Sequence, residues 1–253
     1  ALRHRLSTEA GPRYGRAVMG TVRGILNAAW LAGLYDFEDL SRVRALPRIT
    51  GTPAQAGRYV SHVEVRALFD ACAEAPGSKA KRDRAILALL FGAGLRRSEV
   101  GALDTDDIQT EAPPGGVVRV ESGKGRKGRD VPIGASTVAH VHAWTADPGG
   151  PSPWCPFAFA MRKGGRPREP RAGISGEGIR LLLARLCDLA GIATVRPHDA
   201  RRTYASNLLG AGVDIAIAAR LMGHASITQT AAYDRRGHLE MVEAAGVVRL
   251  PVY

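Results

Sequence analysis

Apolar residues recur at helical spacing near the start of the chain. From about Gly15 to Leu34 they return to one helical face, which predicts an amphipathic helix. The segment from Pro47 to Gly57 is instead rich in Pro, Gly and Thr, a composition typical of a linker between two folded parts. After it, Ser61 and Glu64 form a capping box, in which both side chains satisfy exposed amides at a helix start. We therefore expect a domain boundary near 47–58 and a helix from Ser61 to about Ala75.

The middle of the chain predicts a buried helix followed by a hairpin. Residues 82–91 are apolar on nearly every side, which is typical of a buried helix. Two glycines then interrupt the pattern, and the next helix should begin near Arg96. Between 116 and 133, valines precede a Gly- and Lys-rich stretch, and Val and Ile follow it. This pattern predicts a hairpin with a basic loop at 122–128.

The last part of the chain is again helical in pattern. Helices are expected at about Ser136–Trp144, at Gly176–Ala190 with Gly191 ending it, at His198–Leu209, and up to Met222 after Asp214 as the N-cap. The stretches 148–156 and 162–171 are rich in turn-forming and basic residues, so we interpret them as exposed loops. The predicted fold class is mainly α with a small antiparallel β-sheet, an α+β fold.

Composition limits the class of protein. The chain has 253 residues, of which 45% are hydrophobic, enough for a core. Its longest nearly uncharged apolar run, 85–95, is shorter than the roughly 18 residues that cross a bilayer. The first residues carry charge with no apolar stretch behind them and no initiator Met, so we expect no secretory signal and a trimmed fragment. Three widely spaced cysteines without a Cys-x-x-Cys pair favour a reducing cytoplasm and no metal site.

The charge of the chain points to a class of partner. The formal net charge is +11 and the pI is near 10.2, and such a surplus of Lys and Arg favours a polyanionic partner. Nucleic acid is the leading interpretation. Composition alone leaves a ribosomal protein, a repressor and a protein that binds anionic membranes equally open.

Several basic residues are candidates for phosphate chemistry. Phosphoryl transfer by a protein nucleophile needs fixed cations around the phosphate oxygens and a proton donor for the leaving oxygen. Arg96 lies at a helix start, where a guanidinium can pair with phosphate. His198 and Arg201 lie three residues apart, on one helical face. Taken alone, Arg96 is better explained as a surface or salt-bridging arginine, and the spacing of the other two is weak evidence.

Tyr233 and Lys124 are the candidates for the nucleophile and the proton donor. A phenol has a pKa of about 10, so it attacks at neutral pH only where cations stabilise its anion. His224 precedes Tyr233 by nine residues. Lys124 lies in the loop of the predicted hairpin, where neighbouring positive charge lowers the pKa of an ammonium. Taken alone, Tyr233 is better explained by aromatic packing, and physics does not choose Lys124 over Lys127.

In their order along the chain, these pieces resemble the tyrosine recombinase family, which includes phage integrases and Xer-type resolvases. The motifs are Gly94-Leu-Arg-Arg-Ser-Glu99, Gly123-Lys-Gly-Arg-Lys-Gly-Arg-Asp-Val-Pro-Ile133, Pro197-His-Asp-Ala-Arg-Arg-Thr203, and Leu221-Met-Gly-His224 followed by Tyr233. Each is moderately specific, whereas all four in this order at compatible separations are very specific. The resemblance covers roughly residues 58–245.

The resemblance implies a role for each site residue. Arg96 and Arg201 would clamp the scissile phosphate. His198 and His224 would help to bind it and to stabilise the transition state. Tyr233 would become linked to the 3′ phosphate of DNA. The remaining implied residues are Lys124, which would protonate the leaving 5′ oxygen, Glu99, which would support the pocket, and Arg126, Lys127, Arg129 and Arg202, which we expect to contact DNA.

The resemblance also implies a domain plan and partners. Residues 1–50 would be a partial helical core-binding region that clamps DNA, 51–57 a linker, and 58–253 a catalytic domain with a C-terminal tail. The tail would dock on a neighbouring subunit, or else pack on its own domain. The implied partners are double-stranded DNA, further copies of the chain in a tetramer, and accessory DNA-bending proteins, in the cytoplasm at the nucleoid. No metal or nucleotide cofactor is implied, because the phosphotyrosine bond conserves the energy for resealing.

The leading hypothesis is therefore a site-specific recombinase or integrase. A topoisomerase-like enzyme or a hairpin-forming telomere resolvase would use the same pocket. A noncatalytic DNA-binding regulator would be expected to lack a pocket residue, and every expected residue type is present in this sequence. A basic structural or ribosomal protein would explain the charge but not the ordered motifs.

Overall fold

A computed structural model describes the chain at residues 5, 11–50, 57–111, 115–121, 128–151, 156–159, 173–224 and 226–234. The chain divides into two compact units, Ala1–Ala56 and Gly57–Tyr253. None of the helices within these described ranges has the length and apolar character needed to cross a membrane. The expected loop at 162–171 and the tail after 234 lie outside the described residues.

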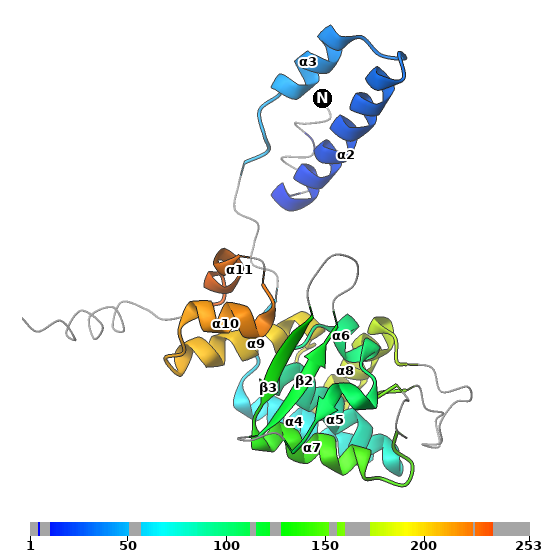
Figure 1. Cartoon of the computed structure of the whole chain (residues 1–253), viewed down its shortest axis with the longest axis vertical. Coiled ribbons are helices and arrows are strands. Elements are labelled where there is room, and N and C mark those ends of the chain that lie inside the picture. The colour runs from blue at the N-terminus through cyan, green and yellow to red at the C-terminus, as the bar shows by residue number, and fades with distance from the viewer. Residues whose placement is uncertain are drawn as a thin grey trace, which may run out of the picture. The chain divides into compact units, whose positions relative to one another are not determined.

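The N-terminal unit contains the helices α2 (Pro12–Leu31) and α3 (Phe37–Ala45), drawn in blue in Figure 1. The helix predicted from Gly15 begins earlier, because Pro12 stands in its first turn, where the fixed φ of proline suits a helix. Helix α3 was not predicted from the sequence. Its signal was Asp36, whose side chain accepts a hydrogen bond from Glu38 N at 2.7 Å and so caps the helix.

The second unit is mainly helical with one small sheet. Its described helices are α4 (His62–Ala71), α5 (Ser78–Gly92), α6 (Arg97–Ala102), α7 (Ala135–Thr145), α8 (Gly176–Ala190), α9 (Pro197–Gly210), α10 (Ile215–Met222) and α11 (Ile227–Ala231). Its strands are β1 (Ile108–Gln109), β2 (Gly116–Val120) and β3 (Arg129–Ile133). The predicted fold class is confirmed. The capping box that starts α4 is present as predicted, whereas β1 and α11 were not predicted.

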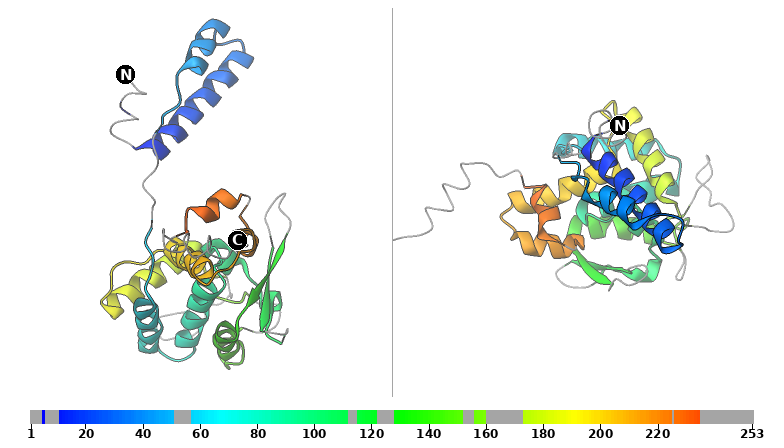
Figure 2. Two further views of the ribbon diagram at one scale, coloured as in Figure 1. Left: turned by 90° about the vertical axis from the view of Figure 1, so that its left-hand side faces the viewer. Right: turned by 90° about the horizontal axis from the view of Figure 1, so that it is seen from above.

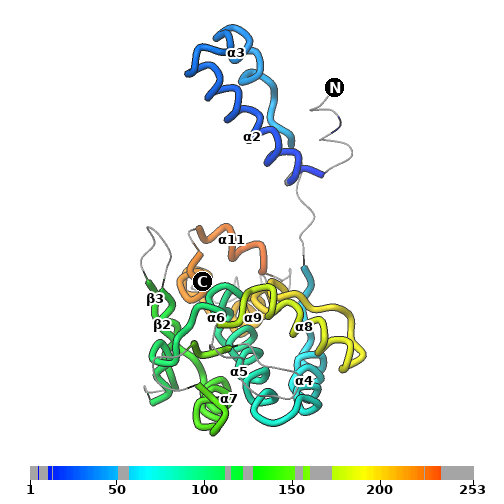
Figure 3. The backbone as a smooth tube through the Cα atoms, turned by 90° about the vertical axis from the view of Figure 1, so that its right-hand side faces the viewer, coloured from blue at the N-terminus to red at the C-terminus, as the bar shows by residue number. Residues whose placement is uncertain are grey.

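Helix α5 is the centre of the core. Its residues from Ala85 to Leu90 are all buried, which confirms the predicted buried helix. Each fully buried Leu or Ile contributes about 1.5–3 kcal/mol, so this run is a large part of the stability of the unit. Figures 2 and 3 show the sheet on one side of α5, and α4 and α8 on the other. Trp144 and Phe159 pack against each other in the same core, with ring centroids 5.4 Å apart.

The sheet is antiparallel in the order β1-β2-β3. Val118 pairs with Val131, and both side chains are buried. Alternate residues of a strand point to the same face of the sheet. The predicted hairpin is therefore confirmed. Ile133 and Arg129 lie on the same face of the sheet as Val131, because side chains alternate along a strand. Arg129 therefore points toward the helices rather than toward solvent.

The segments after α8 bring three helices together. Gly191 ends α8 in the left-handed conformation, with φ 63°, as predicted. Asp214 caps α10 as predicted, since its Oδ1 accepts from Ala216 N at 2.8 Å. Helix α10 packs on α9 and α11 packs on α10 (Figure 1). The C-terminal end of α10 lies against α9, because the carbonyl oxygen of Met222 accepts a hydrogen bond from Arg201.

Candidate active site

Arg96 directly precedes α6 and is held by a residue of the same helix. Glu99 Oε2 accepts a hydrogen bond from Arg96 N at 2.7 Å, which caps the helix. Glu99 Oε1 accepts from Arg96 Nη1, also at 2.7 Å. The other guanidinium nitrogen donates to the carbonyl oxygen of Gly223 at 3.1 Å. The sequence-local cap therefore directs Arg96 toward the C-terminal end of α10.

Arg129 reaches the same carboxylate from β3. Its two terminal nitrogens donate to the two oxygens of Glu99, each at 3.0 Å, in a bidentate pair. Its Nε donates to the carbonyl oxygen of Leu221 at 3.4 Å, and only 17% of the side chain is exposed. We expected Arg129 to contact DNA; in the structure its guanidinium pairs with Glu99, the carboxylate that also holds Arg96. The alternation with Val131 and Ile133 was the sequence signal for this placement.

Glu99 is the carboxylate that joins these arginines. Burial alone would raise its pKa, but the hydrogen bonds from Arg129 and Arg96 and the charge of Arg129 outweigh burial and lower the pKa to about 2. Glu99 is therefore ionised at neutral pH. Its side chain is 12% exposed, so this ionised group is held in a poorly solvated place.

Arg201 comes from α9 and is 3% exposed. Its Nη1 donates to the carbonyl oxygen of Gly94 at 2.5 Å, and its Nη2 donates to that of Met222. Gly94 has φ +62°, and a Cβ there would overlap the ring of Tyr204. Burial, and after it the charge of Arg96, lower the pKa of Arg201 to about 10. Arg201 is thus a buried cation at neutral pH, fixed by carbonyl oxygens of the loop between α5 and α6 and of the last residue of α10.

Tyr233 follows α11 and lies against both predicted histidines. Its hydroxyl is 3.1 Å from Nε2 of His198. The ring centroids of His198 and His224 each lie 6.0 Å from that of Tyr233. Ser206 of α9 donates a hydrogen bond to the carbonyl oxygen of Tyr233 at 3.0 Å. Tyr233 therefore belongs to the pocket of its own chain, which the sequence left open.

His224 is held in a neutral state. Burial, and after it the charges of Arg201 and Arg96, lower its pKa to about 4. Its Nδ1 lies 2.8 Å from Oγ1 of Thr230, a residue that sequence reasoning missed. This contact fixes the orientation of the ring.

The predicted site residues converge from distant parts of the sequence. Those that the structure brings together are Arg96, Glu99, Arg129, His198, Arg201, His224 and Tyr233. Lys124, Arg126 and Lys127 lie outside the described residues. Arg202 lies beside the site, with its guanidinium carbon 5.8 Å from the ring centroid of Tyr233.

A cavity opens beside these residues. Its volume is about 510 Å³, and Arg96, His198 and Arg201 line it. Further basic residues on its wall are Arg97, Arg180 and Arg196. Within the described ranges, no group of three or more His, Cys, Asp or Glu is arranged to hold a metal ion. Chemically, this arrangement can bind a phosphodiester anion and stabilise a phenolate formed next to it.

Solved structures with the same arrangement of elements define the class of fold. The chain matches a crystal structure of the XerH site-specific recombinase bound to difH substrate, in a pre-cleavage complex, with a TM-score of 0.67 and 15% identity over 97% of this chain and 68% of that one. It also matches a lambda integrase dimer bound to a COC′ core site, with a TM-score of 0.66 and 17% identity over 94% of this chain and 63% of that one. The fold is that of the tyrosine recombinases.

Sequence comparison identifies the family. The model of the phage integrase family matches residues 58–238. Tyrosine recombinase XerD of Mycobacterium leprae is 34% identical over 223 residues, which cover 84% of this chain and 66% of XerD. Tyrosine recombinase XerA of Pyrococcus furiosus is 32% identical over 221 residues, which cover 86% of this chain and 72% of XerA. The chain belongs to the phage integrase family of tyrosine recombinases.

Proposed function

We propose that this chain is a site-specific DNA recombinase that cleaves and rejoins DNA strands through a covalent 3′-phosphotyrosyl intermediate. One observation carries the proposal. The hydroxyl of Tyr233 is hydrogen-bonded to His198 beside the buried cation Arg201. A phenol so placed has the two things that its attack on phosphate requires, a proton acceptor and fixed positive charge.

The cleavage step follows from this geometry. Arg96 and Arg201 bind the non-bridging oxygens of the scissile phosphate. Tyr233 Oη attacks phosphorus while its proton passes to His198 Nε2. The bond between phosphorus and the 5′ oxygen breaks, and Lys124 donates a proton to that oxygen. Reversal of these transfers, with the 5′ hydroxyl of another strand as the nucleophile, rejoins DNA with no external energy source.

The charge balance of the pocket supports this division of roles. Glu99 is ionised and paired with Arg96 and Arg129, so it fixes both guanidinium groups before a phosphate arrives. His224 is neutral, and it can donate a hydrogen bond to the phosphate without adding a charge to a pocket that already holds several. Preorganised donors of this kind cost no reorganisation during the reaction.

The proposed partners are double-stranded DNA and further copies of the chain. The basic wall of the cavity, with Arg97, Arg180 and Arg196, supports contact with the DNA backbone. We propose that the chain acts as a tetramer on two recombination sites at the nucleoid in the cytoplasm, with accessory DNA-bending proteins, and that residues 1–50 form part of the clamp around DNA. The XerH recombinase bound to its difH substrate and the lambda integrase bound to a COC′ core site, which share the fold of this chain, support the first of these partners.

The test is formation of a covalent adduct with nicked DNA. Duplexes taken from the DNA that flanks the gene, nicked so that the cleaved end diffuses away, are incubated with the protein and separated in denaturing gels. The wild type and Tyr14→Phe, a control at a 60% exposed tyrosine, should form the adduct, and Tyr233→Phe should not. An adduct that survives Tyr233→Phe, or no adduct with any flanking site, contradicts the proposal. Relaxation of a supercoiled circle without recombinant junctions would favour the topoisomerase-like alternative.

A further inference from the structure

The segment that enters the second unit is fastened along α9. This segment, Gly57–Val60, is called the linker staple below, because it begins at Gly57, the last residue of the expected linker. Its partners on α9 are Asp199, Thr203 and Asn207, which lie four residues apart and therefore on one helical face. The contacts are Arg58 N to Asp199 Oδ1, Val60 N to Thr203 Oγ1 and Tyr59 Oη to Asn207 Oδ1, each at 2.9 Å.

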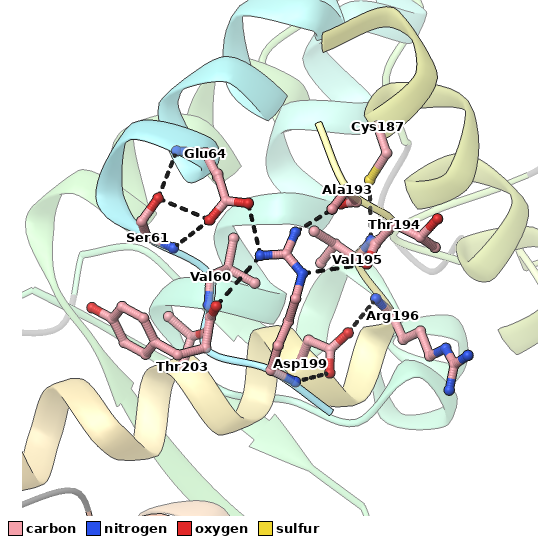
Figure 4. Close-up of polar contacts among 12 residues, drawn as sticks. Val60, Ser61, Glu64, Cys187, Ala193, Thr194, Val195, Arg196, Asp199 and Thr203 are labelled. Atoms are coloured by element: carbon pink, nitrogen blue, oxygen red, sulfur yellow. Dashed lines mark hydrogen bonds and ion pairs between the residues drawn. The ribbon is translucent and has the colours of Figure 1, made fainter. Parts of the chain in front are cut away.

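The carboxylate of Asp199 accepts hydrogen bonds from both the linker staple and the start of α9. It is 2% exposed, and its second oxygen accepts from Arg196 N at 2.7 Å, which caps α9 (Figure 4). Gly57 has φ +101°, and a Cβ there would lie 2.5 Å from Oδ1 of Asp199. Only glycine allows the backbone to approach the carboxylate so closely. The staple is therefore joined to the helical turn that carries His198 and Arg201.

The side chain of Arg58 fixes the staple on its other side. Its Nη1 forms an ion pair with Glu64 Oε1 at 2.7 Å, and its Nη2 donates to the carbonyl oxygen of Ala193 at 2.7 Å. Glu64 belongs to α4 and Ala193 to the loop before α9, and both are labelled in Figure 4. The start of α4 and the loop before α9 are thus joined through the staple.

Arg202 connects the staple to the nucleophile. Its Nη1 donates to the carbonyl oxygen of Gly57 at 3.5 Å. Its guanidinium carbon is 5.8 Å from the ring centroid of Tyr233, within the range of a cation–π contact. One side chain therefore touches both the first residue of the staple and the residue that carries the reactive hydroxyl.

We propose that Arg202 is a positioning residue for Tyr233, and that through Gly57 it couples the nucleophile to the chain that leads to the N-terminal unit. This inference rests on the proposed function. A displacement of the N-terminal unit on DNA pulls on residue 57, and Arg202 and Asp199 transmit it to Tyr233 and to the first turn of α9. The role differs from the DNA contact that the sequence suggested, because it alters the cleavage step and not the affinity for DNA.

The first test separates these two roles. Arg202→Gln and Arg202→Lys are compared with the wild type in single-turnover cleavage of the nicked site at saturating protein, and their Kd for the same DNA is measured at several salt concentrations. Arg202→Gln should slow cleavage on the order of 10²-fold, as expected for a misplacement of about 1 Å, with Kd unchanged. Arg202→Lys should recover most of the rate, because an ammonium also binds a ring face and a carbonyl oxygen.

A phosphate contact gives the opposite pattern. Arg202→Gln would then weaken binding and reduce the slope of log K against log salt by about one, with cleavage at saturation unchanged. That result overturns the inference. Cleavage by Arg202→Gln at the wild-type rate overturns it as well. If the wild type itself forms no adduct, the proposed function fails and the inference fails with it. If the wild type forms the adduct and only the expected effect of Arg202→Gln is absent, the inference alone fails.

The second test displaces the staple without touching Arg202. Gly57→Ala places a methyl group against Asp199, whereas the matched control Gly212→Ala has a comparable positive φ of +80° with nothing within 4 Å of its Cβ. Both substitutions strain the backbone. Only Gly57→Ala should slow cleavage at saturating protein, with both variants compared at a temperature where circular dichroism shows each to be folded. Equal losses of rate in the two variants contradict the coupling.

Discussion

Replacing Glu99 with Gln removes the negative charge that Arg96 and Arg129 share, while the shape of the side chain is kept. The amide also places an N–H group against one of the two guanidinium groups, so a hydrogen bond becomes a repulsion between donors. The positive charges of Arg96, Arg129 and the buried Arg201 then face one another without a carboxylate between them. We expect the second unit to lose stability at neutral pH.

The lowered pKa of Glu99 gives the magnitude. The pKa falls from an ordinary 4.5 to about 2. At about 1.36 kcal/mol per pKa unit, the ionised carboxylate contributes about 3 kcal/mol to the free energy of unfolding at pH 7. Because the folded-state pKa is the lower one, this contribution is complete above pH 4.5 and is lost as the pH falls through 2. The same relation leaves about 2 kcal/mol at pH 3.5.

Urea unfolding at pH 7 and pH 3.5 is the assay, followed by circular dichroism and by tryptophan fluorescence to check that both report one transition. Glu99→Gln should be less stable than the wild type at pH 7, by an amount that shrinks in acid. The matched control is Glu177→Gln, which removes an exposed carboxylate paired with Arg180 and should change little. Equal stability of Glu99→Gln and the wild type at pH 7, or a difference that grows in acid, refutes the reasoning.

Three further outcomes are expected. Gly223→Ala should destabilise the protein more than Gly191→Ala in thermal melts, because both residues have φ near 60° but only a Cβ at Gly223 meets the Arg129 guanidinium, 2.8 Å away. Arg201→Lys should lower the single-turnover cleavage rate by roughly 10²–10³-fold with a much smaller change in Kd, since the loss of a preorganised donor acts on the transition state. His224 should titrate below pH 5 when its ring protons are followed by NMR, because its pKa is about 4, and the protein should lose stability as the pH falls from about 6.5 toward 4.

Local patterns predicted most of the elements. The capping box of Ser61 and Glu64, the N-cap at Asp214 and the glycine that ends α8 were all read correctly, since each depends on residues within four positions of one another. Helix α11 was missed, because its five residues are too few for a helical period to be visible. Helix α3 was missed although Asp36 caps it and Phe37, Leu40 and Val43 recur at helical spacing.

The candidate site depended on two kinds of information. The ordered motifs gathered Arg96, His198, Arg201, His224 and Tyr233 into one hypothesis through their resemblance to a family, and not through any property of a single residue. Taken alone, Arg96 was better explained as a surface or salt-bridging arginine, and Tyr233 was better explained by aromatic packing. The alternation along β3, which places Arg129 on the face of Val131 and Ile133, was a usable signal in the sequence that was not drawn on.

The sequence by itself determined the fold class, the hairpin, the family and the identity of the candidate nucleophile, because these follow from local spacing and ordered motifs. Only the tertiary structure decided that Tyr233 joins the pocket of its own chain, that Arg129 pairs with Glu99, and that Gly57 lies against α9. The reason is distance along the chain. The contact between Arg96 and the carbonyl oxygen of Gly223 joins residues 127 positions apart, and such contacts depend on how every intervening element packs.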